Sequence, residues 1–138
     1  MTAPATESGA QLPALTFESG LPGFPAARHF ALVSLEMDDA GVFLLRSLDD
    51  PALSFVAAAP TPYWPDYAPD VDDVTVERLG ITDAGQALLL VLLTIPEGGA
   101  GATANLIAPI VINSETLLAA QVVLNGSPYS VREPFVLA

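Results

Sequence analysis

The sequence predicts an all-β protein: a single-domain antiparallel, partly open β-barrel-like fold with one short helix near residues 71–79. Two observations carry this prediction. Short stretches rich in Val, Leu, Ile and Phe alternate with turn signals at close spacing, which is typical of sandwiches and barrels. One segment between them, residues 70–80, begins with acids and ends with glycine, as helices do.

The expected strands are the apolar stretches between turn signals. Side chains alternate across a strand, so residues 42–45, apolar at every position, are expected to be buried on both faces. Asp38–Gly41 is expected to form a hairpin loop, with Gly41 supplying a positive φ. The predicted strands are Ala14–Phe17, Phe30–Glu36, Val42–Leu48, Leu53–Ala59, Ala87–Ile95, Thr103–Ile112, Leu117–Leu124 and a short last one at Pro134–Leu137.

The helix prediction rests on the two ends of its segment. Asp70 is the expected N-cap, and Asp72 and Asp73 suit the positive end of the helix dipole. Gly80 suits the left-handed position that ends a helix. The four β-branched residues between them oppose the prediction, because they lose side-chain freedom in a helix.

The length of 138 residues fits one domain, expected over residues 12–138 after a flexible tail over residues 1–11. No Lys or Arg precedes Arg28, so we expect no secretory signal peptide. The longest apolar run, residues 87–95, is far shorter than the roughly 20 residues of a membrane-spanning helix. The chain has no cysteine, which suits a cytoplasmic location.

The charge is strongly acidic and unevenly placed. Sixteen acids face four arginines, and there is no lysine. Nucleic acids and anionic membranes are therefore disfavoured as ligands, whereas a basic protein partner would be attracted. Residues 36–83 carry eleven of the acids and two arginines, which predicts an acidic face. The alternative is that acidity only keeps an apolar-rich domain soluble.

No residue pattern in the chain points to catalysis. Nucleophilic catalysis needs a Ser or Cys beside a base, but His29 is the only histidine and cysteine is lacking. The acidic groups at residues 38–39 and 70–73 lack the pattern of a calcium loop, so turn and helix-start roles explain them more simply. We expect neither an enzyme nor a cofactor or metal site, although a glycosidase-like carboxylate pair stays open.

The segment from Pro60 to Asp70 combines four prolines, three aromatic residues and two acids. A proline-rich segment is already ordered, so fixing it in a complex costs less conformational entropy, and Tyr and Trp are favoured in interfaces. As a surface, the segment is therefore expected to bind a partner. The alternative is that Trp64 and Tyr67 pack inward and cover one end of the barrel.

Several motifs in order resemble one family. They are Gly20-Leu21-Pro22-Gly23-Phe24, Phe43-Leu44-Leu45-Arg46-Ser47-Leu48-Asp49-Asp50-Pro51, Phe55-Val56 with Pro60, Pro65-Asp66-Tyr67, Leu79-Gly80-Ile81, the run Thr103 to Asn113, and Gln121-Val122-Val123-Leu124. Over residues 14–134 the chain resembles the flagellar assembly factor FliW, a family of cytoplasmic β-barrel-like monomers. The resemblance implies binding of the basic translational repressor CsrA and, in a chaperone-like way, of flagellin. Exchange between the two partners would then relieve repression of flagellin translation.

The expected partner-binding face is acidic. Its residues are Asp49, Asp50, Asp66, Tyr67, Asp70, Asp72 and Asp73. Asp49 and Asp50 have an alternative role in capping a turn, and Asn105 and Asn113 are expected to satisfy buried backbone groups. Two other functions stay open: a small β-barrel enzyme or ligand-binding module, which needs a pocket with convergent polar groups, and an acidic decoy of nucleic acid.

Overall fold

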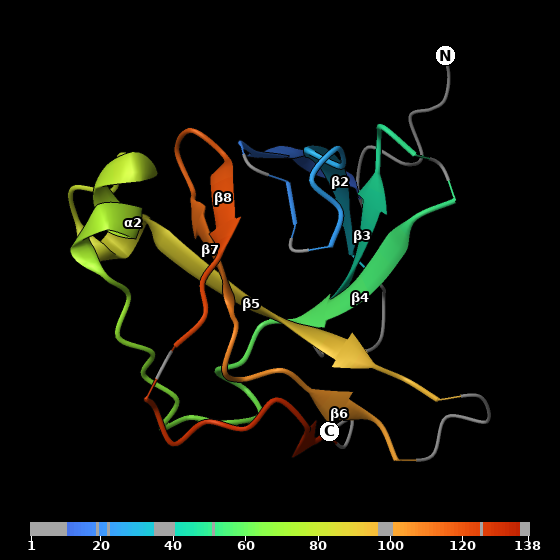
Figure 1. Ribbon diagram of the computed structural model, residues 1–138, viewed down its shortest axis with the longest axis vertical. Helices are drawn as coiled ribbons and strands as arrows, with labels where there is room; N and C mark the ends of the chain where they lie inside the picture. The colour runs from blue at the N-terminus through green and yellow to red at the C-terminus, as the bar shows by residue number, and fades with distance from the viewer. Residues whose placement is uncertain are drawn as a thin grey trace.

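The computed structural model describes most of the chain. The described residues are 11–18, 20–21, 23–34, 41–50, 52–96, 101–124 and 126–135. Nearly all of the regular structure is β, in a single sheet that wraps into a barrel (Figure 1). The strands are β1 Gln11–Phe17, β2 His29–Ser34, β3 Val42–Ser47, β4 Ser54–Ala58, β5 Ala87–Thr94, β6 Thr103–Ala104, β7 Ile110–Asn113, β8 Leu118–Gln121 and β9 Glu133–Pro134.

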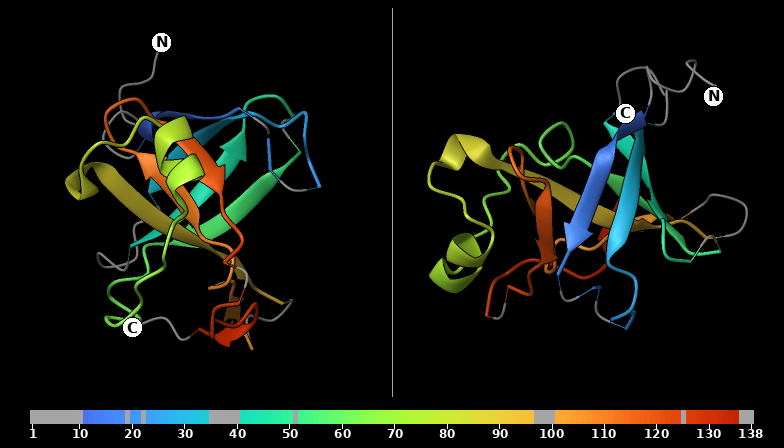
Figure 2. Two further views of the ribbon diagram at one scale, coloured as in Figure 1. Left: turned by 60° about the vertical axis from the view of Figure 1, so that its left-hand side comes forward. Right: turned by 90° about the horizontal axis from the view of Figure 1, so that it is seen from above.

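Seven of these strands form the closed ring, in the order β4-β3-β2-β1-β8-β7-β5. Pairing of Val56–Ala58 in β4 with Val91–Leu93 in β5 closes it. The all-β barrel prediction is thereby confirmed. One seam is parallel, between β1 and β8, and it spans only two residue pairs, Thr16 with Leu118 and Phe17 with Ala119. The short strands β6 and β9 extend the sheet beyond β5 (Figures 1 and 2).

Large apolar side chains fill the inside of the barrel. Phe17 and Phe30 are fully buried and meet edge to face, with ring centroids 5.4 Å apart. Leu45 of β3 and Ile110 of β7 belong to the same cluster, and Phe55 packs against Phe30. Burying one such side chain contributes about 2 kcal/mol. The interior is therefore a packed core that fixes the barrel.

Two further apolar clusters cover the outer surface of the sheet. One lies around Val91 and Ala58, beneath Tyr63, Trp64 and Phe135. The other lies around Val111 and contains Leu79, Ile81, Val122 and Leu124. Because β5 contributes to all three clusters, its near-continuous apolar sequence follows from burial on both faces.

Helix α2, Asp73–Arg78, confirms the predicted short helix but begins later than its expected cap. The N-cap is Asp72, whose carboxylate accepts hydrogen bonds from the Thr75 amide at 3.0 Å and hydroxyl at 2.7 Å. The prediction of Asp70 as N-cap was therefore wrong. Gly80 has a φ of +71°, as predicted for the residue that ends the helix. A short 3-10 helix, η1, follows at Ala84–Gln86.

Two predicted strands differ from the structure. The run over 103–112 is interrupted between β6 and β7, where the Asn105 side chain accepts a bond from the Ala108 amide and Pro109 has no N–H to donate. The last long strand begins at Leu118, because Leu117 has a positive φ of 65°, and ends at Gln121.

The remaining boundaries agree to within a few residues or lie outside the described part. Of the predicted tail over residues 1–11, only Gln11 is described, and it begins β1. The end of the second predicted strand and most of the 38–41 hairpin loop lie outside the described residues, although Gly41 has the expected positive φ of 72°. β9 overlaps the last predicted strand, Pro134–Leu137, only at Pro134, because Phe135 lies outside β9 and residues 136–138 are not described.

Candidate functional site

The predicted acidic face lies in two separate places. Asp49 and Asp50 belong to the turn that follows β3. The other five predicted residues, from Asp66 to Asp73, belong to the segment that leads into α2. The β3–β4 turn and α2 lie on opposite sides of the barrel (Figures 1 and 2). The structure therefore brings five of the seven predicted residues together and separates the other two.

Asp49 and Asp50 both accept bonds from backbone amides, but only Asp50 has the predicted alternative role of capping its own turn. The Asp49 carboxylate accepts bonds from the amides of Arg28 at 2.8 Å and His29 at 2.9 Å, with the His29 ring 3.4 Å away. The His29 amide and then the Arg28 amide hold the pKa of Asp49 below its ordinary value. Asp50 accepts a bond from the Ala52 amide within its own turn.

Tyr67 fixes the acidic segment to the barrel. Its hydroxyl donates to the Leu106 carbonyl at 2.6 Å, and its ring meets Tyr129 edge to face at 4.7 Å. The Tyr129 hydroxyl accepts a bond from the Ala68 amide. Burial, and then the charge of Tyr129, raise the pKa of Tyr67 above its ordinary value. Tyr67 is therefore an anchor beneath the acidic surface.

The neighbouring aromatic residues also pack inward. Tyr63 lies 4.7 Å from Phe135 between ring centroids, and Trp64 lies 6.1 Å from it. Both side chains are half-buried over the cluster around Val91. This arrangement matches the alternative in which the aromatic residues cover part of the barrel. The acids of the segment, in contrast, are exposed to solvent.

The carboxylates of the segment differ in their surroundings. Asp72 is engaged as the N-cap of α2, and the bonds from the Thr75 hydroxyl and then its amide hold the pKa of Asp72 below its ordinary value. Asp66, Asp70 and Asp73 are exposed to solvent. The segment therefore presents several exposed negative charges. Its backbone is fixed by the hydrogen bond of Tyr67 and by helix α2.

An open groove of about 610 Å³ lies beside these acids. Asp70 and Asp72 line it, and so does Val123, about half of whose surface is exposed. Tyr129, the partner of Tyr67, also lines it. The groove combines charge with apolar surface, which suits contact with a protein better than enclosure of a small molecule.

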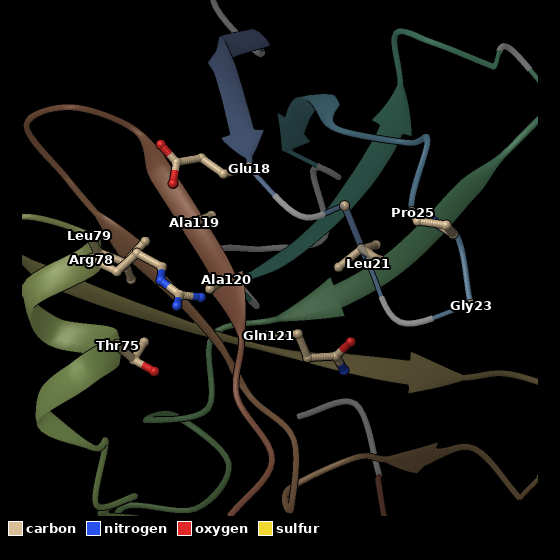
Figure 3. Close-up of a pocket in the computed structure, with 11 residues that line it drawn as sticks. Glu18, Leu21, Gly23, Pro25, Thr75, Arg78, Leu79, Ala119, Ala120 and Gln121 are labelled. Carbon is tan, nitrogen blue, oxygen red and sulfur yellow. The ribbon is translucent and has the colours of Figure 1, made fainter.

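A second groove, of about 390 Å³, was not predicted from the sequence. Its floor is β8, and its walls are α2 and the loop that follows β1 (Figure 3). Glu18 and Arg78 bring opposite charges to it, and Gln121 lies on its floor. The loop wall is the Gly20–Phe24 motif, in which the Leu21 and Phe24 backbones bond to each other. That motif was the only sequence signal for this groove.

Metal binding finds no support in the described residues, where no three His, Cys, Asp or Glu side chains gather closely enough to hold an ion. Nor does the described part contain a helix with the length and apolarity to span a membrane. The predicted structural roles of Asn105 and Asn113 are confirmed. Asn105 accepts from the Ala108 amide, and Asn113 donates to the Leu79 carbonyl at 2.8 Å.

Comparisons with known proteins agree with one another. The family model described as FliW protein matches residues 4–135. The flagellar assembly factor FliW of Bacillus licheniformis is 38% identical over 120 residues, which cover 87% of this chain and 83% of that protein. Its counterpart in Geobacillus thermodenitrificans is 42% identical over 116 residues, covering 84% of this chain and 79% of that protein.

A solved structure shows the same fold. A crystal structure of the flagellar assembly factor FliW superposes with a TM-score of 0.82 at 36% sequence identity. The alignment covers 97% of this chain and 89% of that one. The relationship therefore extends over nearly the whole barrel and includes the segment that carries the acids.

Proposed function

Because the chain belongs to the FliW protein family, we propose that it serves flagellar assembly by binding two proteins in turn. The first is a CsrA-type translational repressor. Once bound, the repressor would release the flagellin messenger RNA. The second is flagellin, which the protein would hold in a chaperone-like way. The observation that carries this proposal is the family match over residues 4–135, together with the shared fold.

The charge of the molecule supports a basic partner. The net charge is −12, and the exposed acids Asp66, Asp70 and Asp73 lie close together along one fixed segment. Such a surface accelerates association with a basic protein and repels nucleic acid phosphates. The proposed site is therefore this segment, without Asp49 and Asp50, which lie on the other side of the barrel.

We further propose that the protein acts without catalysis, in the cytoplasm, as a monomer when free. The family match supports a binding role, since the relatives are described as assembly factors. The packed barrel core supports it too, because the interior is filled by side chains and the two grooves are open features of the surface. A partner-binding surface needs no more than a rigid scaffold and exposed contact residues.

Calorimetry and gel filtration with the CsrA-type repressor and the flagellin of the same organism test this proposal. We expect a stoichiometric complex with each, whose association rate falls as salt rises from about 50 to 500 mM, because salt screens exposed charges. Asp66→Lys should slow association with the repressor, whereas Glu115→Lys, an equal charge change in the β7–β8 turn, should slow it less. Absence of heat and of co-elution with both proteins would refute the proposal.

A further inference from the structure

One edge of β8 is largely unoccupied. β7 pairs with β8 from Ala119 to Gln121, but β1 meets the other edge only at Leu118 and Ala119. β1 then ends at Phe17, and the chain turns away into the loop that forms the groove wall. Beyond Ala119 this edge therefore has no neighbouring strand among the described residues.

The backbone beyond Ala119 keeps its strand-like alternation. The amides of Val122 and Leu124 donate to carbonyls of the segment that leads into β7, those of Pro109 at 2.9 Å and Ile107 at 2.7 Å. Successive residues of a strand direct their N–H and C=O groups to opposite edges. Gln121 and Val123 therefore direct theirs away from β7, and the Val123 backbone bonds to no other described residue.

The two grooves lie end to end along this edge. Residues 119–121 form part of the smaller groove, and residues 122–124 form part of the larger one. α2 borders both grooves, with Arg78 and Thr75 in the smaller and its N-cap Asp72 in the larger. Figure 3 shows β8 between α2 and the loop that follows β1. The exposed edge therefore lies at the bottom of one trough.

A strand edge in a trough fits an extended chain. Such a chain gains backbone hydrogen bonds from the edge and places alternate side chains against the walls. Asp70 and Asp72 line the larger groove. Among the described residues that line the trough, Arg78 is the only arginine, and it lies in the smaller groove. A basic side chain is therefore favoured at the larger end, and apolar contact is offered by Val123.

We propose that the free edge of β8 and of the residues that continue it, from Ala120 to Leu124, binds an extended segment of a partner protein as an added strand, with a basic side chain beside Asp70 and Asp72. This inference rests on the proposed protein-binding function and names the mode of binding. Only the odd-numbered residues Gln121 and Val123 offer backbone groups to the added strand. The segment needs to be only about four residues long to use them.

The test replaces one backbone donor on the free edge. Val123→Pro removes an N–H that makes no bond within the described protein, whereas Val123→Ala keeps the N–H and removes most of the side chain. Binding of the purified CsrA-type repressor and of flagellin is measured by calorimetry. For at least one of them we expect Val123→Pro to weaken binding about tenfold or more and Val123→Ala about threefold or less.

Two measurements keep the test informative if the proline variant folds poorly. Amide hydrogen exchange of the unaltered protein should show protection of Gln121 and Val123 on complex formation, because their N–H groups become bonded. Asp70→Lys should weaken binding more than Glu115→Lys, which changes the charge equally in the β7–β8 turn, away from the trough.

Each outcome decides the matter. Binding that is unaffected by Val123→Pro, or that leaves both amides exchanging freely, overturns the added-strand proposal and leaves the protein-binding function intact. Binding of neither protein overturns both. A dimer of the free protein in sedimentation that Val123→Pro dissolves would assign the edge to a second copy and overturn the proposal of a foreign partner.

Discussion

Asn113 joins the end of β7 to the end of α2, and its replacement tests how the helix is held on the barrel. Its side chain is 1% exposed. Nδ2 donates to the Leu79 carbonyl at 2.8 Å, while Oδ1 accepts from the amides of Glu115 at 2.8 Å and Thr116 at 3.3 Å. One side chain therefore satisfies backbone groups from two elements.

The cost of Asn113→Ala follows from those contacts. It leaves a carbonyl on the buried Leu79 and at least one amide in the β7–β8 turn without their partner. Each unsatisfied group costs about 1–3 kcal/mol, so the free energy of unfolding should fall by about 3 kcal/mol. For a chain of this size that corresponds to a melting temperature lower by roughly 10 °C.

Asn113→Asp adds a dependence on pH. A carboxylate oxygen would replace Nδ2 at 2.8 Å from the Leu79 carbonyl, so the folded protein would retain a proton there to keep the bond. The pKa of the new carboxyl is then raised above about 3.9, its value in the unfolded chain. Because the folded state binds the extra proton, the variant loses stability relative to the parent as pH rises above that value.

Urea unfolding of the parent and the variants at pH 4.5 and 7.5 measures both effects. The stability difference between parent and Asn113→Asp should be larger at pH 7.5, whereas Ser114→Asp, which places a carboxyl on the exposed neighbour, should show little change. An Asn113→Ala protein as stable as the parent, or a pH-independent deficit in Asn113→Asp, would refute the assigned hydrogen bonds.

Three shorter predictions follow from other contacts. In thermal unfolding, Gly20→Ala should destabilise the protein more than Gly23→Ala. Both glycines have a positive φ, but of the two only Gly20 would place a Cβ 2.6 Å from backbone oxygens. Equal losses of stability in the two variants would contradict this. Asp49→Asn should destabilise the protein more at pH 6 than at pH 3. The lowered pKa of Asp49 gives stability at pH values above its ordinary pKa, and that stability is lost as pH falls through the pKa of the folded state. An equal deficit at both pH values would exclude this origin. Tyr67→Phe should lower the free energy of unfolding by about 1–2 kcal/mol, because it removes the hydrogen bond to Leu106. Since the pKa of Tyr67 is raised, the parent should also lose stability above about pH 10 more steeply than this variant in urea titrations.

The sequence was most informative where structure is decided locally. The apolar runs gave the barrel strands, and Gly80 ended the helix as expected, because only glycine adopts a positive φ at no steric cost. The predicted start of helix α2 was misplaced because Asp70 and Asp72 are the same residue type two positions apart. The distinguishing feature was Thr75, whose hydroxyl and amide both bond to Asp72.

Misplaced elements elsewhere have equally specific causes. The run over 103–112 is uniformly apolar in its second half, which conceals the break that Asn105 makes with its own side chain. Pro109 was the signal, because proline interrupts a strand ladder. The early end of β8 had no comparable signal: residues 122 and 124 still bond toward β7, and what changes is the neighbour on the other edge.

Only the part of the candidate site that is continuous in sequence could be predicted, for a physical reason. Asp66 to Asp73 are close in sequence, so any compact fold keeps them together. Asp49 is held by amides about twenty residues earlier in the chain, and sequence spacing does not show such a contact. The trough along β8 depends on how far β1 extends beside it, which is a property of the closed barrel.

The seam between β1 and β8 also has a consequence during synthesis. Thr16 pairs with Leu118, about a hundred residues later, so the first strand leaves the ribosome long before its parallel neighbour exists. At bacterial translation rates this interval is roughly 5–20 s. During that time the barrel lacks one of its strands, and the apolar side chains of Leu15 and Phe17 can be buried only against β2 and β3. A nascent chain stalled before residue 118 would therefore be vulnerable to proteolysis and self-association.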